Sequence, residues 1–176
     1  DLLADAVGWY PISNGYQPLD PARLLDTRPG AATLDGVAVG LGALDADAEL
    51  DLTLVGRGGV PTAGVAAVAL NVTAVDPTAD GFVSVYPSGT SRPNASNLNF
   101  SAGVVVPNAV IVPVGEGGRV ALYNSAGSTH LIVDVVGWFT AAGTTPRDPV
   151  RLLDTRPGGS TRDGGFGGGG PVGGVQ

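Results

Sequence analysis

Arginine and aspartate alternate in a short block that occurs twice in the chain. The first copy is DPARLLDTRPG at residues 20–30, and the second is DPVRLLDTRPG at residues 148–158. In each copy an aspartate lies between two arginines, and a guanidinium can bind a carboxylate through two parallel hydrogen bonds. One interpretation is that Arg23 or Arg28 binds a carboxylate or a sugar. We favour a structural salt bridge that fixes the boundary between repeats, with Asp134 as a second carboxylate, because buried charges have to be paired. The block residues expected in these pairs are Arg23, Asp26, Arg28, Arg151, Asp154 and Arg156.

A second block is also repeated, and it ends in tryptophan and an aromatic residue. It reads DLLADAVGWY at residues 1–10 and HLIVDVVGWF at residues 130–139. In an extended strand Asp134 would share a face with Trp138. The side chains on that face are similar in size in both copies, whereas those on the opposite face are not. We therefore predict that the face with the aspartate and the tryptophan has a fixed partner. The tryptophans are expected in the core or between repeats rather than on a sugar. The residues concerned are Asp5, Trp9, Asp134 and Trp138.

The two blocks keep the same order and nearly the same spacing. The tryptophans are 129 positions apart and the first arginines are 128 positions apart, which is the size of a domain. We therefore expect one complete unit at residues 20–147. Residues 1–19 would be the end of a preceding repeat or an exchanged strand, and residues 148–176 would start a following repeat with a glycine-rich tail. The alternative is a single domain whose two edges share a motif. A tail this rich in glycine is not expected to adopt an ordered structure unless another surface of the protein holds it.

Composition narrows the classes of function. The chain has 176 residues, a net charge of −7 and nine basic residues, all of them arginine, so a basic surface for nucleic acid is not expected. Cysteine is absent, which excludes thiol, disulfide and thiolate–metal chemistry. The apolar runs are far shorter than a membrane-spanning helix requires.

Four acidic residues recur at every second position, at Asp45, Asp47, Glu49 and Asp51. Their oxygens are of the type that Ca²⁺ prefers. We favour a solvated strand edge that resists edge-to-edge pairing, because four carboxylates in a row span too far to converge on one ion. Calcium binding stays open as the alternative, and no cofactor is expected.

The remaining candidates for chemistry are few. His130 is the only histidine, and Ser84, Ser88 and Ser96 do not lie in the G-x-S-x-G pattern of a nucleophilic serine, so we predict that the chain is not an enzyme. Tyr86 lies next to a turn in VYPSG and is the best candidate for an exposed ring that stacks on a sugar.

Short apolar runs alternate with turns rich in glycine, proline, asparagine and aspartate, which indicates strands. We predict an all-β fold, an antiparallel β-sandwich similar to a jelly roll, with a β-solenoid as the alternative. Residues 76–81 (DPTADG) are expected to form a hairpin loop between strands 65–75 and 82–86. The RLLDTR block is expected on a strand with Leu24 and Leu25 on opposite faces. Further strands are expected at 50–55, 96–100, 108–114, 119–123 and 131–139.

Seven sequence blocks carry a resemblance to a known family: RLLDTRPG, GRGGVP, VALNVTAV, GFVSVYPSG, SNLNF, PNAVIVPVG and HLIVDVVGWF, in that order. Together they resemble a repeat module of secreted and cell-surface proteins of actinobacteria and some other soil bacteria, over about residues 1–156. The resemblance implies an extracellular, β-rich module that occurs in tandem copies and has no catalytic residues to transfer.

From these observations we expect a non-enzymatic structural module of a surface stalk or fibre. Its partners would be neighbouring copies of itself, joined head to tail or by strand addition. The alternative is a carbohydrate-binding or adhesion module whose partner is a cell-wall or environmental glycan. Nucleic acid and membrane insertion are not expected.

Overall fold

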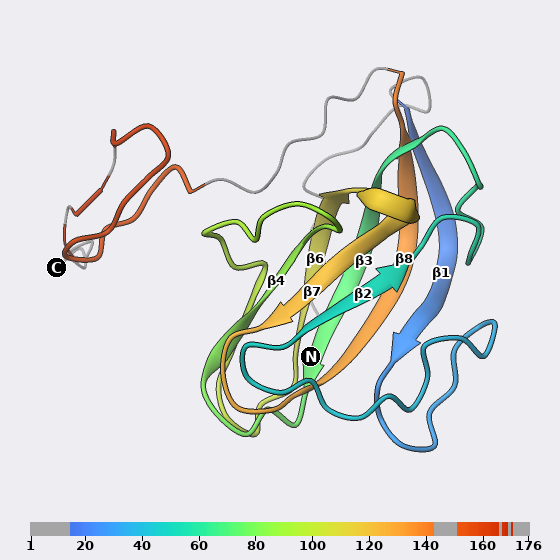
Figure 1. Ribbon diagram of the computed structural model, residues 1–176, viewed down its shortest axis with the longest axis horizontal. Coiled ribbons are helices and arrows are strands. Elements are labelled where there is room, and N and C mark those ends of the chain that lie inside the picture. The colour runs from blue at the N-terminus through green and yellow to red at the C-terminus, as the bar shows by residue number, and fades with distance from the viewer. Residues whose placement is uncertain (1–14, 143–150, 166, 169, 171–176) are drawn as a thin grey trace, which may run out of the picture.

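The chain forms two antiparallel β-sheets packed face to face. The computed structural model describes residues 15–142, 151–165, 167–168 and 170 (Figure 1). Within them, one sheet has the strand order β1-β8-β3-β6 and the other has the order β2-β7-β4-β5. The strands are β1 (Tyr16–Asp26), β2 (Glu49–Thr53), β3 (Val65–Val75), β4 (Gly81–Pro87), β5 (Leu98–Phe100), β6 (Val106–Pro113), β7 (Arg119–Asn124) and β8 (His130–Thr140), and a short 3₁₀ turn at Glu116–Gly118 precedes β7.

This arrangement confirms the predicted antiparallel sandwich and excludes the solenoid for the described residues. The strand order is that of a jelly roll, in which two Greek keys share two sheets. The seven strands predicted after residue 49 lie within two residues of the observed bounds. β1 begins at Tyr16, so the first strand of the sandwich starts four residues before residue 20, where the complete unit is expected to begin.

The hairpin predicted at residues 76–81 is wrong. β3 pairs with β6 and β8, whereas β4 pairs with β5 and β7 in the other sheet. The DPTADG segment therefore crosses from one sheet to the other. Turn residues specify a change of direction, but the sheet that the next strand joins depends on its apolar face and its distant partners.

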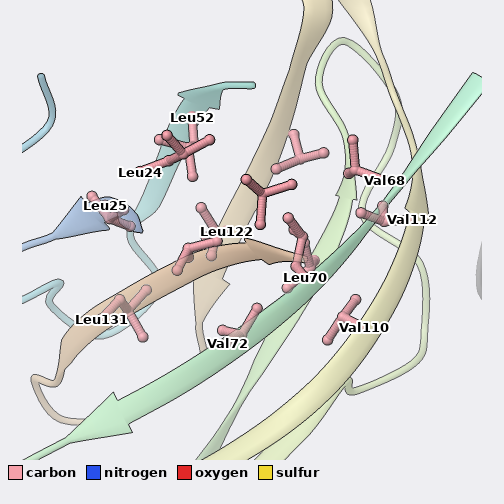
Figure 2. Close-up of a cluster of buried hydrophobic side chains, with 14 of the residues drawn as sticks. Leu24, Leu25, Leu52, Val68, Leu70, Val72, Val110, Val112, Leu122 and Leu131 are labelled. Carbon is pink, nitrogen blue, oxygen red and sulfur yellow. The ribbon is translucent and has the colours of Figure 1, made fainter. Parts of the chain in front are cut away.

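The core lies between the two sheets (Figure 2). Alternate residues of β3, from Val68 to Val72, face inwards and are at most 1% exposed. They meet Leu52 of β2 and Leu122 of β7 from the opposite sheet. Each fully buried side chain of this kind contributes about 1.5–3 kcal/mol to folding.

β8 does not keep one face throughout its length. Its first half alternates, with Leu131, Val133 and Val135 in the core. Val136 is an additional residue opposite β3, and such a bulge reverses the side that the following residues face. Trp138 therefore packs partly buried against the core, whereas Asp134 lies on the outer face. The prediction that these two residues share a face is wrong.

β1 begins and β8 ends at the same end of the sandwich. Tyr16 is paired with Phe139, and the amide of Thr140 donates to the carbonyl of Gly15 at 2.8 Å. In Figure 1 the blue start of β1 and the orange end of β8 lie close together. A polypeptide that continues on both sides of this unit thus enters and leaves it at one end.

Candidate functional site

The arginine–aspartate block joins β1 to β8. Asp26, the last residue of β1, is completely buried and accepts hydrogen bonds from Nε and Nη2 of Arg28 at 2.9 and 2.7 Å. Nη1 of Arg23 donates to the same carboxylate at 3.2 Å, and its Nε donates to Asp134 in β8 at 2.9 Å. The structure thus contains the predicted salt bridges, with Asp134 as the second carboxylate. All four residues lie within residues 15–142, so these ion pairs link β1 to β8 in a single unit, and a role at a boundary between repeats stays a prediction.

The pKa shifts of Arg23, Asp26 and Arg28 all favour the charged forms. The hydrogen bond from Arg28 lowers the pKa of Asp26, against the opposing effect of burial. The hydrogen bond to Asp134 raises the pKa of Arg23. Asp26 and its two arginines therefore stay ionised and paired at neutral pH and are not arranged to exchange a proton.

Thr27 uses its side chain to continue the strand pairing. It is buried, its amide donates to the carbonyl of Leu131 at 3.0 Å, and its hydroxyl accepts a hydrogen bond from the amide of Leu131 at 3.0 Å. The same hydroxyl lies 3.1 Å from Nδ1 of His130. The hydroxyls of Ser84 and Ser88 donate elsewhere, to groups of the other sheet and its loops. The single histidine thus lies beside a threonine that holds the end of the β1–β8 pair.

The second copy of the block reproduces this local structure. Nε and Nη2 of Arg156 donate to Asp154 at 2.8 and 2.6 Å, and Nη1 of Arg151 lies 3.4 Å from the same carboxylate. The hydrogen bond from Arg156 lowers the pKa of Asp154, as in the first copy. The backbone bonds after the block also match: Gly40 to Asp26 and Gly42 to Thr27 at 2.9 Å, Gly168 to Asp154 and Gly170 to Thr155 at 2.7 Å.

This match explains how the described part of the glycine-rich tail is held. The amides of Gly168 and Gly170 bind carbonyls of the block itself, so the surface that holds the tail is the RLLDTR segment before it. Both glycines have positive φ angles, +73° and +77°, as Gly40 and Gly42 do in the first copy. Glycine adopts this conformation without steric cost.

The two copies differ in what surrounds their leucines. Leu24 and Leu25 are both fully buried in the core, because a register shift after Arg23 turns both inwards. The prediction that they lie on opposite faces is therefore wrong. Leu152 and Leu153 are 59% and 64% exposed. In the described part of the chain, the second block has its own ion pairs but does not lie beside a strand like β8.

The acidic row lies along β2 and the turn before it, and three of its four side chains accept hydrogen bonds from separate hydroxyl groups. Asp47 accepts from the hydroxyl of Tyr123, Glu49 from that of Tyr86, and Asp51 from that of Ser88. Arg119 also pairs with Asp51 at 3.0 Å. Within residues 15–142 and the described part of 151–170, no group of three histidines or carboxylates is arranged to hold a metal ion.

Tyr86 is buried, so the prediction of an exposed, sugar-stacking ring is wrong. The residue is 1% exposed, because its ring packs with Ala121, Tyr123 and Phe82 and its hydroxyl donates to Glu49. Burial and the hydrogen bond to Glu49 raise the pKa of Tyr86.

Arg57 is a structural residue that the sequence did not single out. Its Nε donates to Asp35 at 2.7 Å, and its Nη1 and Nη2 donate to the carbonyls of Thr53 and Leu24 at 2.8 and 2.9 Å. It thereby ties the loop after β1 to the end of β2. The only signal was an arginine inside the GRGGVP turn.

A polar cavity of about 290 Å³ lies between the second block and the loop before β5. Its lining includes Arg92, Arg151 and Arg156. The Cζ atom of Arg92 lies 3.8 Å from the ring centroid of Tyr123, a cation–π contact. Arg151 reaches Asn94 across this cavity at 3.5 Å.

Asp5 and Trp9, the other predicted contact residues, lie outside the described residues. No protein-family model and no curated protein matches the chain. In the described ranges, no helix has the length and apolar character that crossing a membrane would need.

Proposed function

We propose that the chain is a non-enzymatic structural module of an extracellular stalk or fibre, and that it joins neighbouring copies through its second arginine–aspartate block. The observation that carries the proposal is the state of that block, which has its ion pairs and loop in place while both leucines are exposed. The extracellular setting rests on the resemblance of the seven sequence blocks.

The exposed leucines supply the driving force for such a joint. The corresponding residues of the first copy are buried, and covering a leucine stabilises by about 1.5–3 kcal/mol. The ion pairs hold Asp154 and its loop in shape before any partner arrives, which lowers the entropy cost of binding. Adding a strand beside the block would satisfy its backbone groups at the same time.

Sedimentation of the full chain over a range of concentrations tests this proposal. We expect species heavier than the 17.4 kDa monomer, and Leu153→Asp should shift the distribution towards monomer. Leu34→Asp is the matched control, because Leu34 is 67% exposed in the corresponding loop of the first copy. A chain that stays monomeric at every concentration would overturn the proposal, as would equal effects of the two variants.

A carbohydrate-binding module is the second candidate, and the polar cavity beside Arg92 is the observation that favours it. Its arginines and amides suit an acidic sugar better than a neutral one. Binding to an array of acidic glycans that Arg92→Ala abolishes would support this function. A failure of the chain to bind any of them would exclude it.

A further inference from the structure

We infer that residues 151–155 receive the N-terminal segment, residues 1–10, of a second copy of this chain, in the register of the β1–β8 pair. The inference rests on the proposed assembly and names its partner segment. In this register the pairs are Arg151 with Asp5, Leu153 with Ala4 and Asp154 with Leu3.

The sequence of residues 1–10 is that of a β8-type strand. Five of its ten positions are identical to β8, among them Asp5 and the glycine–tryptophan pair before the final aromatic residue. β8 is the strand that covers the first block, so the chain carries a copy of each member of the β1–β8 pair. The copies stand at opposite ends of the sequence.

The register follows from the complete unit. There Arg23 is paired with Asp134, Leu25 with Val133 and Asp26 with Ile132. Applying the two repeat spacings to these pairs gives the three contacts stated above. The hydrogen bonds that Thr27 exchanges with Leu131 would correspondingly be made by Thr155 with Leu2.

Charge complementarity supports the same register. Arg23 binds two carboxylates, Asp26 within its block and Asp134 in β8. Among the described residues Arg151 forms its ion pair with Asp154, which is the counterpart of Asp26. Asp5 is the counterpart of Asp134, so it supplies the second carboxylate on the far strand.

The placement of the second block favours a second copy over the same chain. The block lies beside the loop before β5, an edge strand of one sheet. Residues 1–10 precede β1 in the sequence, and β1 is an edge strand of the other sheet. β5 contacts β6, which lies at the edge of that sheet opposite to β1. Figure 1 shows β1 and β6 on opposite sides of β8 and β3. Pairing between two copies needs no rearrangement of the block.

Site-directed disulfide formation tests the register, and the cysteine-free chain gives it a clean background. A chain with the substitution Leu153→Cys is mixed with a second chain that carries Ala4→Cys, under mild oxidation. We expect a disulfide-linked dimer in several-fold excess over the mixture of Leu153→Cys with Ala6→Cys, because directly paired side chains are closer than diagonal ones. Equal yields, or an excess with Ala6→Cys, would overturn the register.

Charge reversal gives an independent readout. Arg151→Asp and Asp5→Arg should each weaken association about two- to fivefold, the range for a partly exposed ion pair. A mixture of the two variants should recover it, since each reversed charge then meets its complement on the other copy. Additive losses without recovery would contradict the Arg151–Asp5 pair.

A chain that carries both Ala4→Cys and Leu153→Cys shows whether the strand at residues 1–10 comes from the same chain or from a second copy. Disulfide-linked dimers and larger species are expected at all but the lowest concentrations, and a closed monomer would show that the strand comes from the same chain. If the unmodified chain assembles but cross-linking shows no preference, the partner strand is wrong and the proposed function survives. If the unmodified chain stays a 17.4 kDa monomer, both the partner strand and the proposed function are wrong.

Discussion

At the scale of single residues, the closure of β1 against β8 depends on one buried carboxylate. Asp26 is 0% exposed and has two arginine partners, whereas the side chain of Asp134 is 18% exposed and pairs with one. Asp26→Asn should lower the free energy of unfolding by about 3 kcal/mol, because it leaves two cations without their buried partner. Asp134→Asn should cost about 1 kcal/mol, as expected for a solvent-accessible pair. Urea unfolding measures both, and equal losses would contradict this ranking.

The same carboxylate gives stability a pH dependence with a defined sign. The pKa of Asp26 is lower in the folded chain than in the unfolded chain, so its contribution is complete above about pH 5 and is lost as pH falls below about 4. Asp35 and Asp154 have lowered pKa values for the same reason, an arginine hydrogen bond. Urea midpoints between pH 7 and pH 2 should fall less steeply in Asp26→Asn than in the unmodified chain.

At the scale of elements, the same sequence block occurs once with its leucines buried and once with them exposed, so the same substitution can be compared in the two copies. Leu25 lies in the sandwich core and Leu153 lies exposed at the same position of the second block. Leu25→Ala should destabilise the sandwich by about 2–5 kcal/mol. Leu153→Ala should change it by less than about 0.5 kcal/mol. Thermal unfolding at low protein concentration, where association does not contribute, checks the contrast. A large loss in Leu153→Ala would place the second block inside the folded unit.

The strands themselves were predictable from the sequence, because alternating apolar residues and glycine- or proline-rich turns are local signals. The ion pairs of Arg23 and Asp26 were also predictable, since buried charges without partners are too costly to persist. The single additional residue Val136 was not, because one inserted residue leaves the apolar run unchanged while it reverses the faces of Trp138 and Phe139.

Long-range contacts account for the remaining differences. Tyr86 is buried by contacts with Ala121 and Tyr123 of β7 and with Glu49 of β2, which lie far from it in the sequence and leave no pattern near the tyrosine. Three of the groups that accept from Arg57 are backbone carbonyls, which every residue carries. The carbonyls to which an arginine donates therefore cannot be predicted from the sequence.

At the scale of the whole molecule, the entry and exit of the chain at one end determine how the unit meets a pulling force. A force applied through Tyr16 and Thr140 reaches the β1–β8 pair at its open end. The hydrogen bonds across the pair then break one after another, as in a zipper.

Single-molecule pulling in two directions tests this property, and cysteine handles are specific because the chain has no other cysteine. A handle at the N-terminus with one at Ala142→Cys opens β1 and β8 from their common end. Handles at Ala32→Cys and Ala142→Cys, both at exposed positions, pull the same two strands past each other, because the strands are antiparallel. In that direction all the hydrogen bonds of the pair share the force. We expect a clearly higher unfolding force for the second geometry at the same pulling speed. Equal forces would show that the β1–β8 pair is not the first part of the unit to yield.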